Sequence, residues 1–332
     1  MRCHLLIPHA VWPNQTESAE VTVGLTLPAF SLLAGRGRCE LFTPIPARDW
    51  QGQAFGLKDF PAGPLTLLAA DACPSPGFWL RADPVHLAIN QRGAEVADPK
   101  ALEVTADEAK QLIDALNVQF ADDGLFFLAA SPDSWLLRLP AAPDASFTPL
   151  ESVLGRNMGE FLPQGRDAGR WHQLINEIQM MLYAHPVNDS RAGQGRPLIN
   201  SLWLWGGGVY PLPEVQPQST SLIHSDDPLL GALAGIAGVN CVPSPGSFSG
   251  VHGTDSLVIL DNLSMPALWR DALAWREAWL GLERDWLAPA LVQLQNGGVS
   301  ELIITLPEAG IKISVRKRDL WRFWRRRSLP WS

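Results

Sequence analysis

At residues 199–208 the chain reads INSLWLWGGG, an apolar and β-prone run that ends in three glycines. This pattern predicts a buried strand that leads into a tight turn. Side chains alternate along a strand, so we expect Trp203 and Trp205 to share one face and to be mostly buried. Glycine tolerates positive φ and a close approach of other backbone. We therefore expect Gly206–Gly208 to form the hinge between two domains.

The composition is that of a globular protein with a substantial core. Apolar residues make up 46% of the 332 positions and charged residues 18%, which is unlike a disordered chain. This length fits one large α/β domain, or a core with an inserted domain. There is no run of about 18 uncharged apolar residues and no secretory signal pattern. Four scattered cysteines fit reduced thiols, so we expect a cytoplasmic protein without a transmembrane segment.

Predicted strands and helices alternate along the chain. Short apolar runs predict strands, and apolar residues spaced three and four apart predict helices. Residues 185–197 are expected to be a polar loop, and the glycines at 231, 235 and 238 to bring one helix close to a sheet. The alternation favours an α/β fold with a mostly parallel sheet covered by helices on both faces. The expected strands are 3–8, 65–71, 81–90, 125–130, 135–139, 222–224, 256–261, 301–306 and 311–315, and helices are expected at 28–38, after the capping box at Thr105, at 171–184, after Asp227 and after Pro266.

Several motifs occur in an order that resembles a known family. They are RADPVHL at 81–87, a helix start TADEA at 105–109, HPVN at 185–188 and NSLWLWGGG at 200–208. This order resembles the archaeal-type cofactor-independent phosphoglycerate mutases, and the segment HSDDPLLGALAGIAGVNCVPSPGSFSG at 224–250 extends the likeness. Nearly the whole chain resembles regulatory proteins of the RpfE type. The resemblance implies an alkaline-phosphatase-like core of residues 1–75 and 200–332, with an inserted α+β cap domain at 76–199.

The resemblance also implies a catalytic apparatus, which this sequence matches poorly. The family uses two divalent metals held by Asp and His, with a serine nucleophile that carries the phosphoryl group. The position of the first ligand reads Pro8-His9-Ala10 here, without a carboxylate, and of the next group only Asp261 matches. No histidine follows His252, although the last ligand pair should fall near residues 307–309. We therefore expect no catalytic residue, metal site or cofactor.

The remaining polar residues are candidates for binding a small anion. His9, with several other residues at predicted strand ends or loops, lies where sites form in such sheets; ordinary loop or capping roles are the alternative. Arg81 with Asp83, and Arg191 with Asn200, match cap and hinge positions of the resembled family. They could hold a phosphate or carboxylate, or pair with one another. The candidate ligand-binding residues are Arg81, Asp83, Arg191, Asn200, His224, His252, Asp255 and Asp261.

Three functions stay open at this point. The first is a catalytically degenerate phosphoglycerate-mutase-like protein that acts as a binding or regulatory module, either for a small phosphorylated or carboxylate ligand or for a protein partner. The second is an active metal-dependent phosphomutase or phosphatase with reorganised ligands. The third is binding to nucleic acid or to a membrane surface through the basic C-terminal segment. We favour the first.

The C-terminal segment differs in charge from the rest of the chain. Arg316 to Arg327 contains seven basic residues and one acid, a charge of +6 that leaves −14 on the remainder. Large apolar groups are rarely left free in water, so Trp321, Phe323 and Trp324 are expected to dock on the body of the protein, with Arg325–Arg327 exposed. For this reason nucleic acid and anionic surfaces are not expected partners of Arg316–Arg327.

Overall fold

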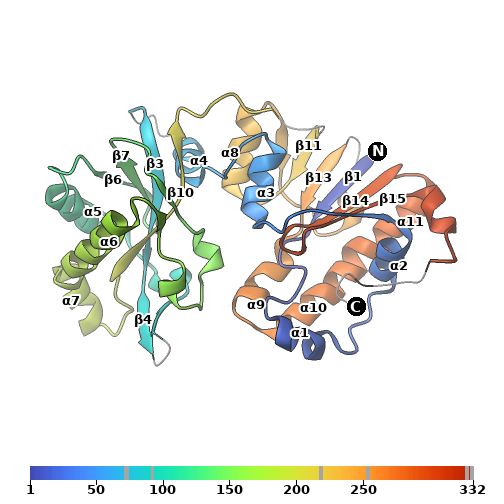
Figure 1. The fold of residues 1–332 in the computed structure, drawn as a ribbon, viewed down its shortest axis with the longest axis horizontal. Helices are drawn as coiled ribbons and strands as arrows, with labels where there is room; N and C mark the ends of the chain where they lie inside the picture. The colour runs from blue at the N-terminus through green and yellow to red at the C-terminus, as the bar shows by residue number, and fades with distance from the viewer. Residues whose placement is uncertain (71–74, 91–92, 217–219, 252–254, 326–328, 330–332) are drawn as a thin grey trace. The chain divides into compact units, whose positions relative to one another are not determined.

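The computed structural model describes residues 1–70, 75–90, 93–216, 220–251, 255–325 and 329 (Figure 1). The chain divides into two compact units. The first unit is Met1–Lys58 with Val215–Ser332, and the second, the inserted unit, is Asp59–Glu214. The predicted boundaries were 75/76 and 199/200. The unit begins and ends at other residues because helix α4, at 62–69, and the tryptophan strand both pack within the inserted unit.

The first unit is built on a seven-stranded sheet with the order β12-β11-β13-β1-β14-β15-β2. Strands β12, β11, β13, β1 and β14 are parallel, whereas β15 pairs antiparallel with both β14 and β2. The predicted mostly parallel sheet is therefore confirmed. The strands are β1 Arg2–Leu6, β2 Arg38–Leu41, β11 Leu222–His224, β12 Asn240–Val242, β13 Ser256–Ile259, β14 Glu301–Leu306 and β15 Ile311–Arg316.

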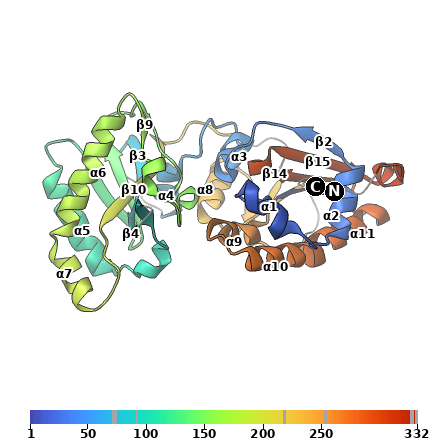
Figure 2. The ribbon, with the colours of Figure 1, turned by 60° about the horizontal axis from the view of Figure 1, so that its bottom comes forward.

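Helices cover both faces of this sheet. Cys3 and Leu5 of β1 pack into a buried core with Trp275 and Trp279, on the face covered by α9, α10 and α11, while α3 lies on the opposite face (Figure 2). The single long helix expected after Pro266 is divided into α9, α10 and α11, and a π-helical turn at Glu283–Leu287 joins α10 to α11. The helices of this unit are α1 Gln15–Thr22, α2 Pro28–Arg36, α3 Ala47–Ala54, α8 Pro228–Ile236, α9 Ser264–Leu268, α10 Ala272–Leu282 and α11 Ala288–Asn296.

The inserted unit has a four-stranded antiparallel sheet with the order β10-β3-β7-β6. One face packs on α5, α6 and α7 through a separate hydrophobic core, and α4 lies against β3 and β10. The capping box at Thr105 is confirmed at the start of α5. Its elements are α4 Ala62–Ala69, β3 Gly77–Val85, β4 Leu87–Asn90, β5 Gly93–Val96, α5 Ala106–Gln119, β6 Phe126–Ser131, β7 Ser134–Leu139, β8 Ala145–Ser146, β9 Gln164–Gly165, α6 Ala168–Tyr183, α7 Pro186–Gly193 and β10 Ser201–Tyr210.

The tryptophan strand is β10, and its two tryptophans are buried as predicted, with exposed fractions of 5% for Trp203 and 4% for Trp205. The predicted glycine hinge is wrong. The register of β10 shifts between Trp205 and Gly208, and Gly206 has a φ of 61°, which together describe a bulge inside the sheet. A Cβ at Gly206 would lie 2.4 Å from Cβ of Ala62 in α4. The glycines therefore allow a helix to approach the strand, several residues before the unit ends.

Other local predictions are also wrong, for reasons of local geometry. A strand was predicted at 65–71, but residues 65–69 belong to helix α4. A short apolar run does not distinguish a buried strand from a buried helix. The expected loop at 185–197 contains helix α7. This helix begins at Pro186, and the His185 side chain caps its amino end. Gly231 and Gly235 of α8 have no atom within 4 Å of an added Cβ, so they do not bring that helix close to a sheet.

The basic C-terminal segment differs from the prediction in its aromatic residues, which were expected to dock on the body. Trp321, Phe323 and Trp324 have exposed fractions of 74%, 77% and 69%. Arg325 is exposed, as predicted, and a terminal nitrogen of its side chain donates a hydrogen bond of 2.9 Å to the carbonyl oxygen of Gly37, at the end of α2. Carbonyls at a helix carboxyl end lack helical partners and attract cations. Arg326 and Arg327 lie outside the described residues. Among the helices that are described, none has the length and apolarity needed to cross a membrane.

Candidate functional site

The loops that follow β1, β13 and β14 bring polar side chains together at the carboxyl edge of the parallel sheet. His9 follows β1, Asp261 and Ser264 follow β13, and Glu308 follows β14. Sites in parallel α/β sheets usually form at this edge. Asp261 was a predicted candidate and His9 was considered with it, whereas Ser264 and Glu308 were not selected. Both lie just after predicted strands, and Glu308 also falls in the segment where the resemblance implies the last ligand pair.

Ser264 links His9 to Asp261. Nδ1 of His9 lies 3.0 Å from the Ser264 hydroxyl, which donates a hydrogen bond to Oδ1 of Asp261. Ser264 is buried, and Asp261 is exposed. The backbone of His9 has a φ of 53°, an unusual conformation for a residue other than glycine, and its carbonyl accepts a hydrogen bond of 3.0 Å from Trp275 Nε1. One hydrogen bond thus holds the ring of His9, and another holds its backbone.

Glu308 connects two other segments at the same edge. Its Oε2 accepts a hydrogen bond of 2.9 Å from the backbone N–H of His9, and its Oε1 accepts one of 3.1 Å from the N–H of Ala47 at the start of α3. Burial raises the pKa of Glu308, and the nearby His9 together with these N–H groups opposes that shift. Both carboxylate oxygens are therefore engaged by the backbone.

This edge does not fit the pair of divalent metals that the resembled family uses. The oxygens of Glu308 bind backbone amides, Oδ1 of Asp261 accepts from Ser264, and Nδ1 of His9 is bonded to the same serine. Among the described residues, no group of three or more His, Cys, Asp or Glu side chains is placed to hold a metal ion. The candidate His252 lies outside the described residues.

His224, another candidate, ends β11 at the same edge. It is buried, and within the described part of the chain neither ring nitrogen has a hydrogen-bond partner of normal geometry. Burial lowers the pKa of His224. The backbone of Pro243 has a smaller effect in the opposite direction.

Arg81 and Asp83, in the inserted unit, pair with each other. Arg81 donates to Oδ1 of Asp83 from Nε at 2.9 Å and from a terminal nitrogen at 2.5 Å, while Trp205 Nε1 donates to Oδ2 at 2.6 Å. The second terminal nitrogen of Arg81 donates to the Thr66 hydroxyl at 2.9 Å. Burial raises the pKa of Asp83, and Arg81 and Trp205 oppose this. Arg81 and Asp83 therefore pair with each other, which was the alternative to ligand binding in the sequence analysis.

Arg191 and Asn200 also have protein partners within the inserted unit. The guanidinium of Arg191 is fully buried and binds Glu108 at 2.9 Å and the carbonyl of Pro197 at 2.7 Å. The Asn200 side chain accepts from the backbone N–H of Leu87 at 2.7 Å and donates to its carbonyl at 3.0 Å. These residues fasten strands and helices of the unit to one another. The structure does not bring them together with Arg81 and Asp83.

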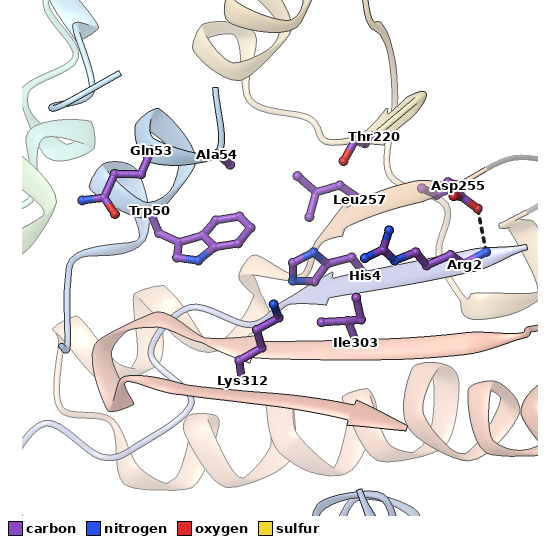
Figure 3. A pocket seen from close by; sticks show the side chains of 11 residues that line it. Arg2, His4, Trp50, Gln53, Ala54, Thr220, Asp255, Leu257, Ile303 and Lys312 are labelled. Atoms are coloured by element: carbon purple, nitrogen blue, oxygen red, sulfur yellow. Dashed lines mark hydrogen bonds between the residues drawn. The ribbon is translucent and has the colours of Figure 1, made fainter. Parts of the chain in front are cut away.

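Asp255 lies away from the other candidates of the first unit, because it precedes β13 and therefore sits at the amino edge of the sheet. Its Oδ1 accepts a hydrogen bond of 2.8 Å from the backbone N–H of Arg2. It lines a pocket of about 430 Å³ between the sheet and α3 (Figure 3). The residues that line this pocket include Arg2, His4, Trp50, Gln53, Thr220, Asp255 and Lys312.

Comparisons with known proteins agree with a phosphoglycerate-mutase-like α/β fold. No protein-family model matches the chain. The chain is 27% identical over 233 residues to a 2,3-bisphosphoglycerate-independent phosphoglycerate mutase of Methanosarcina acetivorans, covering 66% of this chain and 58% of that protein. It is 28% identical over 193 residues to the mutase of the same description from Methanosarcina mazei, covering 55% and 49%. The chain thus spans about half the length of these relatives.

A solved structure supports the same fold. The PH0037 protein from Pyrococcus horikoshii superposes with a TM-score of 0.50 at 14% identity, covering 99% of this chain and 91% of that chain. A likeness at this identity concerns the fold alone. The likeness to phosphoglycerate mutases comes from the two named relatives.

Proposed function

We propose that the protein is a catalytically degenerate relative of the phosphoglycerate mutases and acts as a binding or regulatory module of the RpfE type for a small anionic ligand. In this proposal the inserted unit Asp59–Glu214 corresponds to the cap domain of the resembled enzymes. Similarity to named mutases at 27–28% identity supports the ancestry. The loss of chemistry is supported by the side chains at the carboxyl edge of the sheet.

The observation that carries the proposal is the bonding of Glu308. A carboxylate that ligates a divalent cation presents its oxygens to the ion, but each oxygen of Glu308 accepts a backbone N–H instead. The bonds fasten the loop after β1 and the start of α3 to the loop after β14. Glu308 thus has a structural role at the position where the resemblance implies metal ligands.

A second candidate is an active phosphomutase or phosphatase with reorganised ligands. The specific observation that favours it is the buried Ser264 hydroxyl between the His9 imidazole and the Asp261 carboxylate. A serine hydroxyl within hydrogen-bond reach of a histidine that can act as its base is the first contact of an activated nucleophile. The serine here is anchored on a short helix, α9, that begins at that residue.

A single set of assays separates these candidates. The full chain, purified with Mn²⁺, Zn²⁺ or Mg²⁺ present, is tested for interconversion of 2- and 3-phosphoglycerate and for hydrolysis of p-nitrophenyl phosphate, and its metal content is measured by mass spectrometry. The expected result is no turnover above that of the Ser264→Ala variant and less than stoichiometric metal. Turnover that Ser264→Ala abolishes would establish the second candidate and overturn the first.

A further inference from the structure

The pairing of the strands determines which side chains meet on the α3 face of the first unit's sheet. His4 of β1 lies opposite Leu257 of β13 and Ile303 of β14. Because side chains alternate along a strand, Arg2 and His4 point away from the core that holds Cys3 and Leu5. Arg2, His4, Leu257 and Ile303 therefore form part of the floor of the pocket.

Helix α3 forms the roof of this pocket. The rings of Trp50 and His4 meet edge to face, with centroids 5.2 Å apart, and Gln53 also lines the space (Figure 3). The start of the helix is fixed by the bond from Ala47 N–H to Glu308 and by an ion pair between Arg48 and Asp227. The enclosed volume of about 430 Å³ lies within the range of small-molecule sites, roughly 300–1,000 Å³.

Arg2 contributes a cation to the pocket that is only loosely paired. Its Nε lies 3.4 Å from a carboxylate oxygen of Glu301, but the other oxygen of Glu301 is bound at 2.9 Å by Arg316. Strong charge-assisted bonds are about 2.7–2.9 Å long. Glu301 is thus shared by two cations, and Arg2 holds the longer contact.

Lys312 contributes a second cation in the same way. Its ammonium lies 3.9 Å from Glu40, whose other oxygen is 3.3 Å from Arg38. One carboxylate is again shared between two cations. Figure 3 shows the Arg2 guanidinium and the Lys312 ammonium on either side of the His4 ring, and both cations act electrostatically on that ring.

His4 is an uncharged hydrogen-bonding group between the two cations. Its Nε2 lies 2.8 Å from the Thr305 hydroxyl. Burial, followed by the charges of Lys312 and Arg2, lowers the pKa of His4 to about 3. An anion bound beside the ring would favour the protonated imidazole and raise this pKa.

We propose that the pocket between α3 and the sheet binds the phosphate group of a small phosphorylated molecule, held by Arg2 and Lys312 with the rest of the ligand against Trp50 and Gln53. A phosphate dianion matches two cations that have bonding capacity left. Asp255, whose Oδ1 already accepts from Arg2 N–H, would accept a hydroxyl of the ligand through its other oxygen. This inference rests on the proposed function, because it names the ligand class of that binding module and where the ligand lies.

The test measures binding of inorganic phosphate and of 3-phosphoglycerate to the full chain by titration calorimetry at neutral pH. Lys312→Met and Arg2→Gln should each weaken binding about tenfold or more, since each removes a charge-assisted bond. Arg38→Gln is the matched control, because Arg38 shares Glu40 with Lys312 but is highly exposed and does not line the pocket. It should change binding less than about twofold, as expected for a screened surface charge. Melting temperatures confirm that the variants are folded.

Several outcomes would overturn the inference. These are no saturable phosphate binding, equal losses in Lys312→Met and Arg38→Gln, or binding of acetate as tight as that of phosphate. Histidine NMR gives an independent readout, with His4 assigned through His4→Gln: phosphate should raise the pKa of His4, and a shift confined to His9 would place the anion at the carboxyl edge instead. Catalytic turnover with intact, Lys312-dependent phosphate binding would refute the proposed function alone, and an inactive protein without that binding would refute the inference alone.

Discussion

Oε2 of Glu308 accepts a hydrogen bond of 2.9 Å from the backbone N–H of His9, which lies 299 positions earlier in the chain. The bond fastens the loop after β1 to the loop after β14, and it supports the unusual backbone of His9, with its φ of 53°. The Ala47 N–H, bonded to the other oxygen, extends the same connection to α3. A single side chain thus couples the carboxyl edge of the sheet to the roof of the pocket.

Replacing Glu308 by Gln should lower the free energy of unfolding by about 1–3 kcal/mol, because the amide nitrogen cannot accept a backbone N–H and one buried donor loses its partner. Urea denaturation of the full chain measures the change. Glu277→Gln, an exposed position on α10, is the control and should stay within about 0.5 kcal/mol of the parent. Equal stability of the two variants would show that the Glu308 bonds contribute little.

The pKa of His4 predicts a dependence of stability on pH. Burial and the charges of Lys312 and Arg2 lower the pKa to about 3 in the folded chain, from an ordinary value of 6.5. Between these values the unfolded chain binds a proton that the folded chain does not, so stability should fall as the pH drops from about 6.5 toward about 3. His4→Gln should reduce this slope by at most about 1.4 kcal/mol per pH unit. Urea denaturation at a series of pH values tests it, and an identical slope in the variant would contradict the shift.

Two glycine substitutions, one in the bulge of β10 and one in helix α8, should have opposite effects on stability. Gly206→Ala should destabilise the chain by about 1–3 kcal/mol, because an added Cβ meets Ala62 at 2.4 Å and the φ is 61°. Gly231→Ala, within α8 and with no atom near its added Cβ, should stabilise it by roughly 0.5–1 kcal/mol through helix propensity. Thermal denaturation compares the two. A neutral Gly206→Ala would argue against the close approach of α4.

The pairing of Arg81 with Asp83 also has a measurable consequence. Arg81→Met leaves a buried carboxylate without its ionic partner, so it should cost about 3–5 kcal/mol of unfolding free energy. Lys110→Met is the control, since Lys110 and Asp114 form an exposed ion pair, and it should leave the free energy of unfolding nearly unchanged. If Arg81→Met were as mild as the control, Asp83 would have to be protonated in the folded chain. That state would agree with the direction in which burial shifts its pKa.

The sequence predicted the strands of both sheets well where a run was bounded by turn residues, as for β1, β13 and β14. It failed for α4, because PLTLLA has neither the length nor the periodicity that separates a buried helix from a strand. The candidates Asp255 and Asp261 flank one short strand, β13, yet lie at opposite edges of the sheet.

The pocket under α3 could not be predicted for a related reason. Its side chains come from β1, β13, β14, β15, α3 and adjoining loops, and only the register of the sheet brings Arg2, His4 and Lys312 together. The alternation of polar Arg2 and His4 with buried Cys3 and Leu5 was a signal of a second covered face. Without the strand order, it did not indicate which residues lie opposite.

The C-terminal aromatics give the last prediction, in which two substitutions of the same kind should differ widely. Trp324 is 69% exposed, whereas Trp203 is 5% exposed and donates a hydrogen bond of 2.8 Å to the carbonyl of Thr148. Trp203→Ala should therefore cost about 3–5 kcal/mol of unfolding free energy, and Trp324→Ala less than about 0.5 kcal/mol. Urea denaturation of both variants checks this. A large loss in Trp324→Ala would mean that the aromatic residues dock on the body, as the sequence pattern predicted.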